Sequence, residues 1–162
     1  MKTKYLSGLV LLLLLAVGFA SCNDDEEHWY DSMKDGRPFF SGHVVRFYFI
    51  DNEQYFRRPG LYGYDDDYER FAYFDFAVLE LISHLDIKPD VLHLHDWQTA
   101  MIAMLYKERY CYYEHYDNIK IVFTIHNIAF QGKADPKLLS ELFGLDNYLY
   151  YNGNCRNDGC LN

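Results

Sequence analysis

The chain is poor in positive charge. Its 162 residues include 15 lysines and arginines against 24 aspartates and glutamates, which gives a formal net charge of −9. A protein that binds nucleic acid through the phosphate backbone needs a basic face, and no cluster of lysines and arginines of that kind occurs. We therefore expect no nucleic acid among its partners.

Several motifs that would indicate a particular chemistry are missing as well. Neither G-x-G-x-x-G nor a Walker pattern occurs, so the sequence has no glycine-rich loop to hold phosphates. No G-x-S-x-G nucleophile elbow is found either. The composition is 50% hydrophobic and 19% aromatic, which excludes disorder over most of the length and predicts one domain with a hydrophobic core.

The first 22 residues differ from the rest. A short basic start precedes an apolar run from Leu9 to Phe19, and small residues lead into Cys22. This order is typical of a secretory signal peptide, here residues 1–21, with Cys22 as the lipidation site of a bacterial lipoprotein. An uncleaved membrane anchor is the alternative, which the short apolar run disfavours. Residues 22–41 are predicted to form a linker.

Cysteine usage conflicts with export. Three cysteines follow Cys22, an odd number for a disulfide framework. Cys155 and Cys160 could pair or bind metal, but no second pair of ligands accompanies them, and free thiols in a reducing cytoplasm are the simpler interpretation. The start of the chain therefore predicts a membrane-anchored lipoprotein, held only through Cys22, while the body predicts a cytoplasmic protein.

Beyond residue 42, apolar strands alternate with helices. Strands are predicted at Val44–Ile50, Asp90–His95 and Ile119–Ile125, because these runs are β-branched or almost continuously apolar. The order β-α-β-α-β-α predicts an α/β fold, namely a partial Rossmann-like parallel sheet with helices on both faces.

Three helices are predicted from periodicity and capping residues. The first, Asp67–Leu85, repeats apolar residues at three- and four-residue steps, and the acidic run Asp65-Asp66-Asp67 is interpreted as a solvated helix start. Asp96 would cap the second, Trp97–Arg109, with its carboxylate. Asp135 and Pro136 would open the third, which runs to Phe143.

Polar segments follow two of the strands at the edge where parallel sheets bind ligands. They are His93–Trp97 and His126–Gly132, and the loop 51–64 is expected at the same edge. His93 and His95 share one face of their strand, so with Asp96 and His126 they could form a zinc or iron site. Nothing else fixes a metal-ligand spacing, and strand-end histidines bonded to the backbone explain the pattern equally, so we expect no metal.

Three ordered blocks resemble bacterial glycogen synthases and plant starch synthases. They are FIDNEQYFRRPGLYGYDDDYERFAYF (Phe49 to Phe74), KPDVLHLHDWQTAMI (Lys88 to Ile102) and VFTIHNIAFQG (Val122 to Gly132), and the segment DPKLLSELFGLD also fits. The resemblance covers residues 42–162. It implies part of the N-terminal catalytic domain of a two-domain GT-B glycosyltransferase.

The resemblance also implies an activity and roles for residues. Family members transfer glucose from ADP-glucose, or in some cases UDP-glucose, to the non-reducing end of an α-1,4-glucan with retention, without cofactor or metal. His126 would hydrogen-bond the donor glucosyl unit and stabilise the oxocarbenium-like transition state, and Asp96 would face the same sugar. The implied substrate-binding residues are Asn127, Trp97, Tyr62 and Gln131; Trp97 suits the core equally well.

The sequence departs from the family pattern at both ends. A Lys-x-Gly-Gly-Leu loop that contacts the nucleotide-sugar phosphates does not precede Val44, and the second domain with its diphosphate-binding residues does not follow Asn162. We therefore expect an incomplete fragment that transfers no glucose alone. The alternatives are a surface lipoprotein with a glycan-binding or structural role, and a reading frame that joins a lipoprotein start to a synthase interior.

Overall fold

The computed structural model describes residues 10–12 and 47–162, which belong to two units. The first unit contains 10–12 and 62–162, and the second contains 47–61. The predictions for Cys22, for the linker and for most of the signal peptide lie outside the described residues.

Residues 47–61, the described part of the second unit, form one short helix, α2 (Glu53–Phe56). The side chain of Asn52 caps it by accepting the backbone N–H of Tyr55 at 3.1 Å. Residues 47–50 form no strand, so the described part of the strand predicted at Val44–Ile50 is wrong. A strand needs a partner for its backbone groups, and the place beside the strand Val91–His95 is occupied by residues 10–12.

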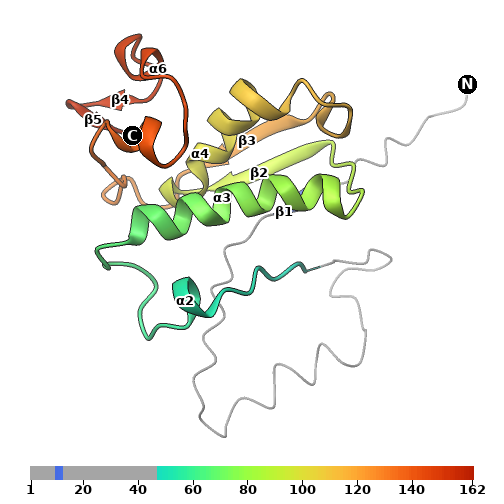
Figure 1. Ribbon diagram of the computed structural model, residues 1–162, viewed down its shortest axis with the longest axis horizontal. Helices are drawn as coiled ribbons and strands as arrows, with labels where there is room; N and C mark the ends of the chain where they lie inside the picture. Colours follow the sequence, from blue (N-terminus) through green and yellow to red (C-terminus); the bar gives the residue numbers. More distant parts are fainter. Residues whose placement is uncertain (1–9, 13–46) are drawn as a thin grey trace, which may run out of the picture. The chain divides into compact units, whose positions relative to one another are not determined.

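A parallel sheet forms the centre of the first unit (Figure 1). Strands β2 (Val91–His95) and β3 (Lys120–Thr124) pair in parallel, with Leu92 opposite Ile121. On the other side of β2 lies β1 (Val10–Leu12), which falls within the segment predicted as a signal peptide. The two later strands and the α/β fold class are thus confirmed.

Two helices build the core together with β2. α3 (Asp67–His84) precedes β2, and α4 (Trp97–Leu105) follows it and continues as a π-helical turn, η1 (Tyr106–Tyr110). α3 packs against α4, and α4 packs against β2. The fully buried side chains at their junction are Leu79, Ile82, Leu92, Leu94, Ile102 and Leu105.

The two long helices, α3 and α4, lie on one face of the sheet, whereas the sequence predicted helices on both faces. The strand order β1-β2-β3 advances in a single direction, so right-handed crossovers place α3 and α4 on the same face. Burial along β2 alternates accordingly: Leu92 and Leu94 are fully buried, while His93 and His95 are partly exposed.

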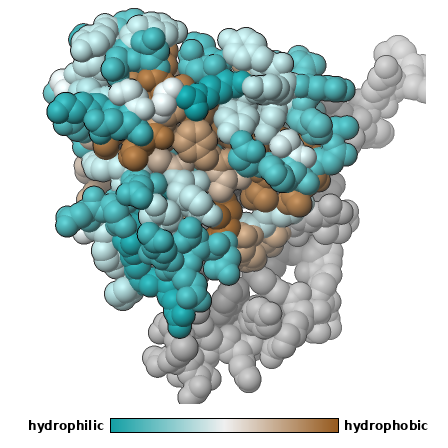
Figure 2. All heavy atoms as spheres, in the orientation of Figure 1, coloured by the Kyte–Doolittle hydropathy of each residue, from teal (hydrophilic) through white to brown (hydrophobic). Residues whose placement is uncertain are grey.

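Apolar surface remains exposed at the edge strand β3. The exposed fractions of Val122, Phe123 and Ile125 are 45%, 43% and 54%. Figure 2 shows one face of the molecule, on which apolar residues gather between hydrophilic areas. Among the described helices, none has the length and apolar character needed to cross a membrane.

The C-terminal third consists of short elements, which are η2 (Glu114–Tyr116), α5 (Leu138–Glu141), α6 (Tyr148–Tyr151), β4 (Arg156–Asn157) and β5 (Cys160–Leu161). α5 begins later than predicted, because Ala134 is paired with Leu161 and the Asp135 carboxylate accepts the Lys137 N–H at 2.9 Å in a turn. The cysteines at 111, 155 and 160 are free thiols.

Candidate functional site

The C-terminal ends of β2 and β3 bring three histidines and an aspartate together. His95 Nδ1 lies 2.9 Å from His126 Nε2, and the Asp96 carboxylate accepts the backbone N–H of His126 at 2.7 Å. His93 Nε2 lies 2.7 Å from the hydroxyl of Thr124 on β3. The predicted convergence of these residues on one edge of the sheet is therefore confirmed.

Asp96 does not use its carboxylate as predicted. It occupies the N-cap position of α4, but its side chain makes no capping hydrogen bond and instead reaches His126. Its backbone φ is +57°, a left-handed conformation that costs a non-glycine residue about 1–3 kcal/mol and that recurs at functional sites. The hydroxyl of Thr99 ties the start of α4 to β2 by accepting the His95 N–H at 2.7 Å and donating to the His95 carbonyl at 2.8 Å.

His95 is partly exposed, but one of its two ring nitrogens is enclosed by neighbouring residues. Its Nε2 has no accessible surface and no hydrogen-bond partner within residues 10–12 and 47–162. Burial lowers the pKa of His95 below its ordinary value, His93 and His126 lower it further, and Asp96 opposes them. The side chain is therefore neutral at pH 7.

The rings of His95 and His126 meet end to end. The two ring planes are 18° apart, and the ring centroids are 5.1 Å apart. The centroid distance exceeds the 2.9 Å between the facing nitrogens by about one ring width, as expected for two rings that meet edge to edge. The contact is therefore an in-plane hydrogen bond and not a face-to-face stack. Within the described residues, no group of three histidine, cysteine or acidic side chains is arranged to hold a metal ion.

His126 and Asn127 are exposed at the start of the loop that follows β3. The side-chain oxygen of Asn127 accepts the backbone N–H of Ala129 at 3.0 Å, which closes a tight turn. Asn127 therefore shapes this loop, and the imidazole of His126 is accessible to a ligand.

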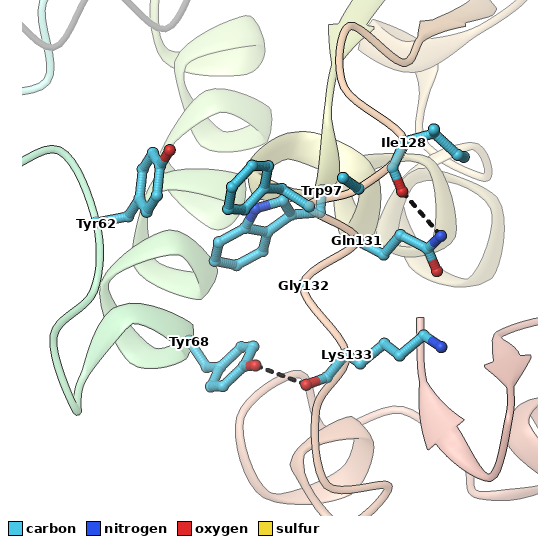
Figure 3. Close-up of a pocket in the computed structure, with 9 residues that line it drawn as sticks. Tyr62, Tyr68, Trp97, Ile128, Gln131, Gly132 and Lys133 are labelled. Carbon is cyan, nitrogen blue, oxygen red and sulfur yellow. Dashed lines mark hydrogen bonds between the residues drawn. The ribbon is translucent and has the colours of Figure 1, made fainter.

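An open cavity of about 530 Å³ adjoins this edge, since Trp97 follows Asp96 and residues 128–133 follow His126 (Figure 3). Tyr62, Tyr68 and Trp97 form one part of its lining, and residues 128–133 form the other. Of the predicted site residues, Tyr62, Trp97 and Gln131 line the cavity, whereas His126, Asp96 and Asn127 lie outside its lining.

Trp97 holds the cavity in shape. Its indole packs edge-to-face on Phe71 with ring centroids 5.1 Å apart, and its ring centroid lies 5.8 Å from that of Tyr68. Gly132, at φ +58°, lies so close that a Cβ there would overlap the indole. Of the two roles that the sequence left open for Trp97, packing is the one that these contacts describe.

Two exposed aromatic rings, those of Tyr62 and Phe130, line the cavity. Tyr62 is 49% exposed and Phe130 56%, and their ring centroids lie 6.2 Å apart. The sequence analysis identified Tyr62 but missed Phe130, whose only signal was its place in the third block. It also missed Tyr68, whose hydroxyl donates to the carbonyl of Lys133 at 2.7 Å (Figure 3).

Gln131 is engaged within the chain. Its amide nitrogen donates to the Ile128 carbonyl at 2.9 Å (Figure 3), and its amide oxygen accepts from Asn157 at 2.9 Å. The amide nitrogen therefore closes the loop 128–133 on itself, and the amide oxygen ties this loop to the C-terminal segment.

A buried ion pair between Arg70 and Asp67 lies next to the segment that carries Tyr62. Arg70 is 1% exposed, and its Nε lies 2.9 Å from an oxygen of Asp67, although the pair lacks the geometry of a hydrogen bond. The other carboxylate oxygen accepts the N–H of Gly63 at 2.5 Å. The prediction of a solvated acidic run is therefore wrong for Asp67, because the arginine draws it inside.

Sequence comparisons identify relatives of known class. A family described as "Starch synthase catalytic domain" matches residues 21–162. A glycogen synthase of Lactococcus lactis subsp. lactis is 54% identical over 118 residues, which are 73% of this chain and 25% of that protein. A glycogen synthase of Clostridium botulinum is 56% identical over 115 residues, or 70% of this chain and 24% of that protein. The chain thus spans about a quarter of the length of the curated relatives it matches.

A solved structure that is similar to this chain is also a starch synthase catalytic domain. The catalytic domain of Starch Synthase IV from Arabidopsis thaliana, bound to ADP and acarbose, is 42% identical, with a TM-score of 0.55. The match covers 60% of this chain and 20% of that one.

Proposed function

Because the chain belongs to the starch synthase catalytic domain family, we propose that it supplies the glucosyl-facing part of a retaining glucosyltransferase site. The proposed reaction moves glucose from ADP-glucose to the non-reducing end of an α-1,4-glucan. The observation that carries the proposal is the contact across the sheet edge, in which the Asp96 carboxylate holds the backbone of His126 and leaves its ring exposed.

His126 is suited to stabilise positive charge at the sugar. Departure of ADP leaves an oxocarbenium-like glucosyl unit, and groups that are already oriented stabilise it best. The hydrogen bond from the His126 N–H to Asp96 fixes this backbone segment; the adjacent carbonyl would stabilise the positive charge, and the exposed imidazole would hydrogen-bond the sugar. Asp96 is the second residue that we propose contacts the donor sugar.

The open cavity is suited to hold the glucan. Its volume of about 530 Å³ falls within the range of roughly 300–1,000 Å³ that is usual for small-molecule sites. The exposed rings of Tyr62 and Phe130 offer aromatic faces on which the apolar faces of sugar rings pack. The Arabidopsis neighbour is bound to ADP and acarbose, which supports a nucleotide and a saccharide as ligands of this family.

A chimeric enzyme tests this function. The matching 118 residues of the Lactococcus lactis glycogen synthase are replaced by those of this chain, and incorporation of labelled glucose into glycogen is measured from ADP-glucose and, in parallel, from UDP-glucose. We expect incorporation from ADP-glucose that His126→Ala lowers by about 10²–10³-fold in the same chimera. A folded chimera without activity, beside an active parent enzyme, contradicts the proposal. The chain alone, assayed in parallel, is expected to incorporate no glucose.

We propose separately that residues 1–21 act as a signal peptide and that Cys22 carries a lipid, in which case cleavage before Cys22 removes β1 from the sheet. The basic start, the apolar run and the small residues before Cys22 support this anchor. Palmitate labelling of the chain expressed in bacteria tests it, with Cys22→Ser as the control. Labelling that disappears in the control supports the anchor, and an unlabelled cytosolic product contradicts it.

A further inference from the structure

His95 and His126 share one hydrogen bond whose direction matters. Their facing nitrogens are 2.9 Å apart and their rings nearly coplanar, so the N–H of one ring points at the lone pair of the other. Two neutral imidazoles can make this contact in two ways, with either His95 Nδ1 or His126 Nε2 as the donor.

The second nitrogen of His95 distinguishes the two arrangements. Its Nε2 is inaccessible and has no partner in the described part of the chain. If His126 donated, neutral His95 would carry its proton on Nε2 and would bury an N–H group that has no acceptor. If His95 donates, Nε2 is bare, and buried orphan acceptors are tolerated more often than orphan N–H groups.

A doubly protonated His95 is disfavoured as well. It would bury the same orphan N–H group and would place a positive charge beside two other imidazoles. Burial, His93 and His126 all lower the pKa of His95, and only Asp96 acts in the opposite direction. The arrangement that satisfies these constraints is the neutral His95 with its proton on Nδ1.

We propose that His95 is a positioning residue that donates its Nδ1–H to Nε2 of His126 and thereby fixes the tautomer of His126. Neutral His126 then carries its own proton on Nδ1, for which the described residues offer no hydrogen-bond partner. His126 is thus held at two points, its ring by His95 and its backbone by Asp96, and presents an N–H donor outward. The consequence for glucosyl transfer rests on the proposed function: a sugar oxygen of the donor would accept this N–H.

Nitrogen-15 NMR of the full chain labelled at histidine tests the proposal without any substrate. At a pH above the histidine titration range, two-bond nitrogen–proton correlations reveal which ring nitrogen of each histidine carries the proton. We expect His126 to be protonated on Nδ1 and bare on Nε2. Protonation of wild-type His126 on Nε2 overturns the proposal, and this result does not depend on any variant.

Three variants test the role of His95. His95→Asn keeps an N–H donor near the position of Nδ1, so His126 should retain its tautomer. His95→Leu removes the donor, and His126 should shift toward protonation on Nε2. His93→Leu removes a neighbouring imidazole whose Nε2 lies against Thr124 and which makes no hydrogen bond to His126 within residues 47–162, so it should leave the tautomer unchanged. An unchanged tautomer in a folded His95→Leu variant overturns the proposal, and unshifted His84 and His115 signals verify its fold.

The chimeric enzyme then tests the consequence. His95→Leu should lower kcat about tenfold or more while His95→Asn retains most of it, because a histidine in the wrong tautomer offers a lone pair where the ligand needs a donor. The KM for ADP-glucose should change less than kcat. An inactive chimera whose His126 shows the expected tautomer refutes the proposed function and leaves the positioning role standing. An active chimera with the opposite tautomer refutes the positioning role alone.

Discussion

Replacing Gly132 by alanine tests the packing that shapes the cavity. At φ +58° an alanine loses roughly 1–2 kcal/mol from backbone strain alone. Its Cβ would also overlap the indole of Trp97, and overpacking of that kind costs roughly 1–3 kcal/mol. We therefore expect Gly132→Ala to lower the free energy of unfolding by about 2–5 kcal/mol.

Urea unfolding followed by far-ultraviolet circular dichroism measures this change. Tryptophan fluorescence is unsuitable, because Trp97 is one of only two tryptophans in the chain. Gly153→Ala is the matched control: its φ is +91° and nothing lies within 4 Å of an added Cβ, so it should show the backbone part alone. In a Trp97→Ala background, Gly132→Ala should likewise lose only the backbone part. Equal effects of Gly132→Ala in both backgrounds would refute the close packing of the two residues.

Further predictions concern other residues that hold the site. Arg70→Met leaves the Asp67 carboxylate buried without its partner and should destabilise the fold by about 3–5 kcal/mol in urea unfolding; a change below about 1 kcal/mol contradicts the buried pair. Burial raises the pKa of Asp75 well above its ordinary value, so the fold should lose stability as the pH rises from about 4 through that raised pKa. Asp75→Asn should abolish this decline in a pH series of thermal unfolding, and a variant that keeps the decline counts against the assignment. Thr99→Val removes the hydroxyl that bonds both backbone groups of His95 and should destabilise by about 0.5–2 kcal/mol; a neutral effect shows that the tie to α4 is dispensable.

Features that depend on neighbours in the sequence were predictable. α3 follows from repeated apolar residues and α4 from the N-cap position of Asp96, and the structure begins both helices where predicted, at Asp67 and Trp97. The strands β2 and β3 follow from short apolar runs, and their parallel pairing placed Asp96 and His126 at one edge. The edge of the sheet that carries the candidate site could therefore be located from the sequence pattern alone, although the roles of its residues came from the resemblance to a family.

Features that depend on contacts between distant residues were not predictable. The capping rule assigned the Asp96 carboxylate to its own helix, but in the structure this carboxylate accepts the backbone N–H of His126, 30 positions away. Position 132 also depends on a distant contact, because a side chain there would overlap the indole of Trp97 on α4. The pairing of β1 beside β2 lay in a segment whose composition predicts a signal peptide. Local rules describe which contacts a residue can make and leave open which partner it finds in the fold.

The most direct test of the central claim is the steady-state kinetics of two variants in the chimeric glycogen synthase. If the edge around His126 faces the donor sugar and the open cavity holds the glucan, the two sites should affect different constants. We predict that His126→Ala lowers kcat by about 10²–10³-fold, and that Phe130→Ala raises the KM for glucan while kcat changes little. A His126→Ala chimera that keeps kcat within a few-fold of the unsubstituted chimera would contradict the account.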